Sequence, residues 1–219
     1  MAPTRPDRTG ATGNIGARIV KEAANRGHEV VGVVRDAAAV KSPDARVPLQ
    51  QGDATDARSV TRLARDADAV VSAISPRPNA RGLAAPSLAA AARALLAGVR
   101  EAGKKRLVIV GGAGTLEVAP GQALMDQPGF PEAYQAEARA GREAMAVPRK
   151  EGTGLDWTYL SPAAEVGPGD RTGNYRTTDD RFLTDDKGKS FITFEDYAVA
   201  LVDELEHPKH SGRRFGVAY

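Results

Sequence analysis

Cysteine is absent from the 219-residue chain, and histidine and aromatic residues are scarce. The lack of cysteine excludes disulfides, thiolate metal sites and a cysteine nucleophile. The three histidines, His28, His207 and His210, do not have the spacing of a zinc motif, so we expect no metal site. Aromatic residues make up only 5% of the chain, which argues against a broad flavin-stacking surface.

Long apolar runs and tracts of one charge are also missing. No run approaches the roughly 18 residues of a membrane-spanning helix, and residues 1–9 lack the apolar centre of a signal peptide. The 30 basic and 28 acidic residues give a net charge of only +2, without a Lys/Arg-rich run. We therefore expect a cytoplasmic protein with a small-molecule substrate and with no nucleic-acid or membrane partner. A homodimer is left open.

The chain does contain a regular alternation of short apolar runs and helical segments. A helical pattern over 14–26 is followed by a run rich in β-branched residues over 28–34. This alternation predicts an α/β fold, a Rossmann-like doubly wound parallel sheet with helices on both faces. The other expected helices cover 58–67, 86–102, 132–150 and 195–206, and the other expected strands cover 47–50, 68–74, 104–110, 154–160, 191–194 and 215–218.

The alternation breaks after residue 164. We expect one NAD(P)-binding domain over 1–219, in which 165–219 is a small C-terminal substrate-side portion. Residues 165–190 are rich in Gly, Asp, Arg and Thr and predict a loop or a short hairpin.

A glycine-rich segment, GATGNIG, stands directly before the first helix. Gly10 would permit a tight turn, Gly13 the close approach of a phosphate, and Gly16 the close packing of helix on strand. Thr12 and Asn14 add side-chain donors at a helix N-terminus, where backbone N–H groups favour an anion. The segment therefore predicts a pyrophosphate site.

Two residues at strand ends bear on the adenosine half of such a cofactor. Arg35 stands about twenty residues further on, where an acidic residue would bind the ribose of NAD and an arginine suits the 2′-phosphate of NADP. Asp36 follows directly, so NADP is preferred while NAD stays open. A surface arginine without a ligand is the alternative for Arg35. Asp53 could accept a hydrogen bond from the adenine amino group.

The segment before the glycines is unusual for this fold. Residues 4–9 read TRPDRT where a buried apolar strand is expected, and Pro6 lacks a donor for the strand ladder. We predict that residues 1–5 are irregular and that the chain enters the strand position at about residues 5 to 9.

The order of motifs TGATGNIG, VVGVVRD, QGDATD, VVSAISP, LVIVGGAG and LDWTYLSPA resembles that of the atypical short-chain dehydrogenase/reductases. The resemblance is strongest to the NmrA-like NAD(P)H-binding group, which includes proteins named as NADH-flavin reductases, and it extends to biliverdin reductase B. It covers almost the whole chain from Gly10 and is specific for fold and cofactor class, not for substrate.

The resemblance implies a role for residues at each strand end. The pyrophosphate would be held by Gly10, Thr12, Gly13, Asn14 and Ile15, and the adenosine end by Arg35, Asp53 and Ala54. The ribose and nicotinamide would lie beside Ala73, Ile74, Ser75 and Pro76, the substrate beside Gly111, Gly112 and the residues to Thr115, and the carboxamide near Ser161, Pro162, Ala163 and Ala164.

The chain departs from the family pattern at the catalytic acid. Active short-chain reductases pair a tyrosine with a lysine four residues later, but here Tyr134 is followed by alanine at position 138. Thr115 could replace the family serine, so Thr115 and Tyr134 are the candidate catalytic residues. For Tyr134, packing or substrate lining is the favoured alternative. Trp157 and Tyr159 are expected in the core.

These features predict an NAD(P)H-dependent oxidoreductase that acts on a small planar acceptor, such as a flavin, a quinone or a polyketide-like carbonyl. Hydride transfer does not itself require a protein acid, because the cofactor carries that chemistry. The alternatives are an NmrA-like cofactor-sensing regulatory protein without turnover, and a non-redox isomerase, dehydratase or lyase on the same fold.

Overall fold

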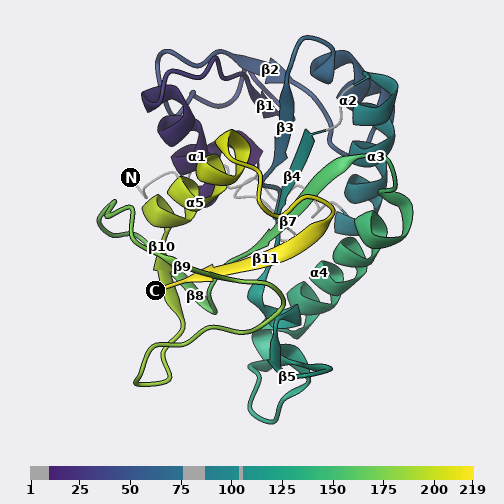
Figure 1. The fold of residues 1–219 in the computed structure, drawn as a ribbon. Coiled ribbons are helices and arrows are strands. Elements are labelled where there is room, and N and C mark those ends of the chain that lie inside the picture. The colour runs from purple at the N-terminus through teal and green to yellow at the C-terminus, as the bar shows by residue number, and fades with distance from the viewer. Residues whose placement is uncertain (1–9, 76–86, 104–105) are drawn as a thin grey trace.

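The computed structural model describes residues 10–75, 87–103 and 106–219, and a five-stranded sheet forms its centre (Figure 1). The strand order is β3-β4-β7-β11-β9, in which neighbours are parallel except for the antiparallel edge strand β9. In register, Val71 pairs with Val108, and Val108 with Thr158. The strands span Ala69–Ser72 (β3), Arg106–Val110 (β4), Asp156–Ser161 (β7), Arg176–Thr178 (β9) and Arg213–Ala218 (β11).

Helices cover both faces of this sheet. In the interior strand β4, Val108 packs into one core with residues of α1 and α5, whereas Leu107 and Ile109 pack into a second core with residues of α2, α3 and α4. This alternation follows from the two-residue period of a strand. Figure 1 shows α1 and α5 on one side and α3 and α4 on the other. The helices span Asn14–Asn25 (α1), Ala57–Ala64 (α2), Leu88–Glu101 (α3), Glu132–Glu151 (α4) and Phe194–Glu206 (α5).

Three short strand pairs and three turns of 3-10 helix complete the described part of the chain. β1 and β2 are parallel, as are β8 and β10, whereas β5 and β6 are antiparallel. These strands span Gly32–Val34 (β1), Leu49–Gln51 (β2), Glu117–Ala119 (β5), Gln122–Ala123 (β6), Glu165–Gly167 (β8) and Phe191–Thr193 (β10), and the 3-10 turns span Gly10–Thr12 (η1), Ala113–Thr115 (η2) and Leu124–Asp126 (η3).

The architecture confirms the α/β prediction of a parallel sheet between two layers of helices. Trp157 and Tyr159 are buried, as expected. The first described strand is shorter than predicted: it begins at Gly32, because residues 28–31 are mostly exposed and β1 pairs only over the three residues that face β2.

The prediction of a loop or short hairpin over 165–190 was right for most of these residues, which are irregular, but it missed two short strands. β8 and β9 both lie in this region, but they do not pair with each other. β8 instead pairs with the edge of β10, and β9 pairs with the edge of β11. The strand expected within residues 5–9 and the cofactor residue Pro76 lie outside the described residues.

Candidate functional site

The glycine segment forms a tight loop whose geometry requires glycine at two positions. Gly10 has a φ of +65°, a left-handed conformation that only glycine adopts without strain. A β-carbon on Gly16 would lie 1.9 Å from the carbonyl oxygen of Gly10, so the start of α1 lies directly against the loop. The N–H of Gly13 donates to the same carbonyl oxygen at 3.2 Å. Gly16 therefore allows α1 to pack closely against the loop, and its predicted packing of helix on strand stays a prediction.

The loop leads directly into the N-terminus of α1, where the first backbone N–H groups are not used by the hydrogen bonds of the helix. The N–H of Ala17 donates to the carbonyl of Gly13, the residue directly before α1, at 2.8 Å. The N–H groups of Asn14, Ile15 and Gly16 precede this bond and have no carbonyl partner within the helix. Gly13 has no side chain with which to cap them. This arrangement suits an anion at the helix start.

The loop lies against the last residues of β1. A β-carbon on Gly10 would be 3.2 Å from the carbonyl oxygen of Val33, and one on Gly32 would be 3.2 Å from the β-carbon of Ala11. Arg35 follows β1 directly. The loop and the first candidate adenosine residue are therefore neighbours in the fold.

A cavity of about 670 Å³ lies at the ends of β1 and β2. It brings together Arg35 and Asp53, two of the predicted cofactor residues, and adds Arg58 and Arg62, which the sequence reasoning missed. The signal that could have identified these two is their i, i+4 spacing at the start of the helix that follows QGDATD. Three arginines thus surround one cavity beside the glycine loop.

The polar groups of this cavity are partly committed to the protein itself. Oδ1 of Asp53 accepts from the N–H and the hydroxyl of Thr55, at 2.8 and 2.7 Å. Nη2 of Arg62 donates to the carbonyl of Gln51 at 3.1 Å. The guanidinium of Arg58, by contrast, has no hydrogen-bond or ion-pair partner among the described residues. Arg58 is therefore a cation available to a ligand.

Two buried hydroxyls lie at the carboxyl ends of two strands of the five-stranded sheet. Ser72 ends β3 and Ser161 ends β7, and within the described part of the chain neither Oγ has a hydrogen-bond partner. Leaving a buried hydroxyl unsatisfied costs about 1–3 kcal/mol. Such groups are expected where a ligand or ordered water completes the site. The other predicted residues of this edge lie close by in sequence: Ala73, Ile74 and Ser75 are half-buried, Gly112 is exposed, and Pro162 and Ala163 are buried.

Tyr159 packs between the loop after β4 and α4. A β-carbon on Gly111 would lie 2.0 Å from the Tyr159 ring, and the Tyr159 hydroxyl donates to the carbonyl of Gly141 at 3.4 Å. Burial raises the pKa of Tyr159 to about 12. The ring therefore spaces the loop after β4 from α4 and keeps its proton at neutral pH.

The two predicted catalytic residues have different environments. Thr115 is buried, and its hydroxyl accepts from Nη1 of Arg214 at 2.8 Å and approaches the Met145 sulfur at 3.8 Å. Tyr134 stands in the first turn of α4 with half of its surface exposed. Among the described residues, Thr115 therefore packs in the interior, whereas the Tyr134 side chain is half-exposed to solvent. Their catalytic roles remain predictions.

Position 138, where the family places lysine, is closed by packing. Ala138 is buried, and a β-carbon on Gly114 would lie 2.8 Å from that of Ala138. α4 thus rests directly on η2, so the alanine serves close packing where the family places a proton-relay lysine.

The described residues hold no group of three or more His, Cys, Asp or Glu side chains placed to bind a metal ion. Within 10–75, 87–103 and 106–219, no helix is both long and apolar enough to cross a membrane.

The fold and the glycine loop define a Rossmann-like protein of the dinucleotide-binding class. The family of NAD(P)H-binding proteins matches the chain over residues 10–208. The chain therefore belongs to this family, and the resemblance noted in the sequence is confirmed.

Three solved structures show the same architecture over nearly the whole chain. A protein of Burkholderia pseudomallei, provisionally described as exported, is 44% identical, with a TM-score of 0.85 over 95% of this chain and 96% of that chain. A protein of Bacteroides thetaiotaomicron, provisionally named an epimerase, is 38% identical, with a TM-score of 0.84 over 96% and 94%. A protein of Streptococcus pneumoniae, provisionally named an NADH-flavin reductase, is 31% identical, with a TM-score of 0.77 over 95% of each chain.

Proposed function

We propose that the protein is an NADPH-preferring oxidoreductase that reduces a small planar acceptor such as a flavin or a quinone. The observation that carries the proposal is the conjunction of the glycine loop with the arginine-lined cavity at the end of β1. The loop provides backbone donors for a pyrophosphate, and the cavity provides cations for a further phosphate. Membership of the NAD(P)H-binding family supports the same cofactor class.

The residues present fit a dinucleotide along the carboxyl edge of the sheet. Gly10, Gly13 and the first turn of α1 would hold the pyrophosphate, and Arg35 with Arg58 would hold a 2′-phosphate. The unpartnered hydroxyls of Ser72 and Ser161 would lie toward the nicotinamide half. A bound nicotinamide would supply hydride transfer. We further propose that residues 165–219 provide the substrate side of the site.

The chain's own groups favour an acceptor that needs no strong protein acid. The position of the family lysine is occupied by Ala138, and the buried hydroxyl of Tyr159 keeps its proton. A flavin or quinone can take its proton from water, whereas a simple ketone requires a placed donor. Tyr134, exposed at the start of α4, would orient the acceptor or relay a proton from solvent.

The test is a calorimetric titration with NADPH and with NADH, followed by NADPH oxidation with a panel of flavins, quinones and carbonyl compounds. We expect tighter binding of NADPH than of NADH, and turnover with a planar acceptor. Absence of binding by either dinucleotide would overturn the proposal.

A second function has specific support. The alanine at position 138 leaves Tyr134 without the lysine that lowers the pKa of the tyrosine in active short-chain reductases, and the 38% identical Bacteroides protein is provisionally named an epimerase. The titration and the turnover assays together separate the alternatives. Dinucleotide binding without turnover of any acceptor would favour a cofactor sensor, and conversion of a substrate without net NADPH consumption would favour a non-redox enzyme.

A further inference from the structure

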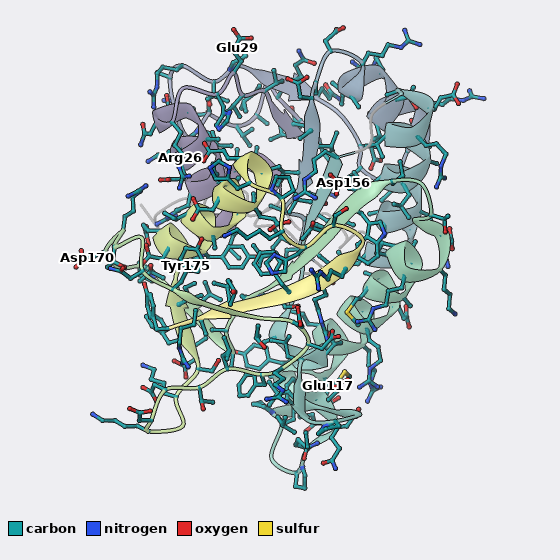
Figure 2. The ribbon with its side chains drawn as sticks, viewed as in Figure 1. Arg26, Glu29, Glu117, Asp156, Asp170 and Tyr175 are labelled. Atoms are coloured by element: carbon teal, nitrogen blue, oxygen red, sulfur yellow. The ribbon has the colours of Figure 1, made fainter. Side chains whose placement is uncertain are left out.

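A second and larger cleft, of about 830 Å³, lies between the second half of α5 and the segment 173–177, and it is closed at its base by β11. None of its lining residues belongs to the predicted dinucleotide site or to the arginine-lined cavity. Figure 2 shows Arg26 and Tyr175, which flank this part of α5, on the same side of the molecule. The cleft is therefore a separate feature of the fold.

Helix pairing places this cleft far from the glycine loop. α1 and α5 run side by side in the same direction, since Arg18 near the start of α1 pairs with Glu195 at 3.0 Å and Arg26 beyond its end pairs with Asp203 at 2.6 Å. The cleft is lined by Ala200, Asp203 and later residues of α5. The 12-residue α1 is about 18 Å long at 1.5 Å per residue, so roughly the length of this helix separates the cleft from the loop.

The acidic side chains of the cleft are already neutralised by the protein. Asp203 accepts from Nη1 of Arg26 at 2.6 Å and also from the hydroxyl of Tyr175. Glu204, with a side chain only 3% exposed, accepts from Nη2 of Arg106 at 3.1 Å and contacts Nδ1 of His210 at 2.8 Å. Neither carboxylate is available to attract a cationic ligand.

Two nitrogen-bearing side chains of the cleft, in contrast, are uncommitted. Nζ of Lys209 and the imidazole of His207 have no hydrogen-bond or ion-pair partner among the described residues. Their backbones are nevertheless fixed, because the N–H of His207 donates to the carbonyl of Asp203 at 2.8 Å and that of Lys209 donates to Oε2 of Glu204 at 3.2 Å. The loop after α5 thus holds two donors at the cleft with their side chains free.

The remaining lining combines aromatic rings with the polar residues Asn174, Arg176 and Thr177. The His210 ring stacks on Phe215 with centroids 4.0 Å apart and an interplanar angle of 11°. Tyr175 and Ala200 contribute apolar atoms on the opposing elements. Small-molecule sites typically combine mostly apolar walls with a few polar groups that fix orientation, at volumes of roughly 300–1,000 Å³.

From these contacts we propose that the cleft is a second binding site, for a small planar organic carboxylate. The rings of Tyr175 and His210 would contact the planar body, and Lys209 with His207 would bind the carboxylate. The site is independent of the dinucleotide site and does not rest on the proposed reductase activity.

The experiment is a calorimetric titration of the full chain with 2-naphthoate, with and without saturating NADPH. We expect saturable binding of one probe per chain that NADPH does not displace. The double substitution His207→Gln/Lys209→Gln should weaken binding about tenfold or more, because a charge-assisted hydrogen bond contributes about one such factor. The uncharged analogue 2-naphthalenemethanol should bind the unaltered protein at least tenfold more weakly.

The matched control is Lys187→Gln, which removes an exposed lysine from a turn that does not line the cleft. It should leave 2-naphthoate affinity unchanged, and thermal unfolding should show both variants folded. Three results would each overturn the proposal: no saturable binding, an affinity that survives the double substitution, or complete displacement by NADPH. NADPH binding is measured in its own titration, so failure of the dinucleotide-site proposal can be distinguished from failure of the second-site proposal.

Discussion

Gly16 lies so close to Gly10 that a β-carbon on Gly16 would be 1.9 Å from the Gly10 carbonyl oxygen. Real β-carbons do not approach backbone oxygen to that distance, so any larger residue must push α1 away from the loop. Such a shift would move the backbone donors that the dinucleotide proposal uses.

Gly16→Ala should therefore destabilise the fold by about 1–3 kcal/mol, as overpacking does, and weaken NADPH binding more than tenfold. Denaturant unfolding and calorimetry check the two effects. Gly27→Ala is the control, because Gly27 has a φ of +88° and no atom within 4 Å of an added β-carbon. It should cost about 1 kcal/mol in strain yet leave NADPH affinity intact. Equal losses of affinity in both variants would contradict the role of Gly16.

We expect Arg35 and Arg58, which line the cavity after β1, to bind the 2′-phosphate of NADPH. Arg35→Gln and Arg58→Gln should each weaken NADPH binding about tenfold and change NADH binding little, because a lost charge-assisted contact is worth about 1.5–3 kcal/mol. The measurement is the ratio of the two dissociation constants. Arg65→Gln, on the exposed end of α2 and outside the cavity, is the control. A ratio that stays constant in both cavity variants would show that neither arginine selects NADPH.

Thr115 and Tyr134 can be separated by two conservative substitutions. Thr115→Val removes the hydroxyl that Arg214 contacts at 2.8 Å, so it should lower the free energy of unfolding by about 1 kcal/mol. Tyr134→Phe alters a half-exposed side chain, so stability should not change measurably, whereas kcat/KM for a planar acceptor should fall if its hydroxyl meets the substrate. A Thr115→Val variant with unaltered stability and lost turnover would support the catalytic role predicted from the sequence.

The sequence predicted the layered α/β fold because its signals are local. Each helix and most strands carry their own periodicity, and the glycine spacing identifies the start of α1. For the same reason the sequence placed Arg35 and Asp53 at strand ends. The structure brings both to one cavity, and their binding of a cofactor stays a prediction.

Other features depend on contacts between distant segments and left no local signal. β9 pairs with β11, and Thr115 is held by Arg214 across 99 positions of the chain. The neighbourhood of Arg58 becomes visible only when α2 packs beside β1 and β2. The second cleft, beside α5, is likewise formed by three separate segments of the chain, so no local sequence motif predicts it.

An ion-pair network around the buried Glu22, between α1 and the segment after β8, gives the last prediction. Glu22, only 5% exposed, accepts two hydrogen bonds of 2.7 Å from Arg171 and a further one of 2.7 Å from Arg26. The hydrogen bonds from Arg171 lower the pKa of Glu22 below its ordinary value of 4.5, against the opposing effect of burial. A lowered pKa means that this stabilisation is complete above pH 4.5 and is lost as the pH falls through the native pKa.

Glu22→Gln should therefore cost about 1.5–3 kcal/mol of unfolding free energy at pH 7, the value of hydrogen bonds to a charged group. The difference from the unaltered protein should shrink as the pH is lowered below 4.5, because protonation then neutralises the native glutamate as well. Denaturant unfolding between pH 7 and pH 3 measures this convergence. Glu29→Gln, at an exposed glutamate without an ion-pair partner among the described residues, should shift stability by less than about 0.5 kcal/mol throughout. A Glu22→Gln deficit that stays constant down to pH 3 would show that the lost stability comes from side-chain packing and not from the carboxylate charge.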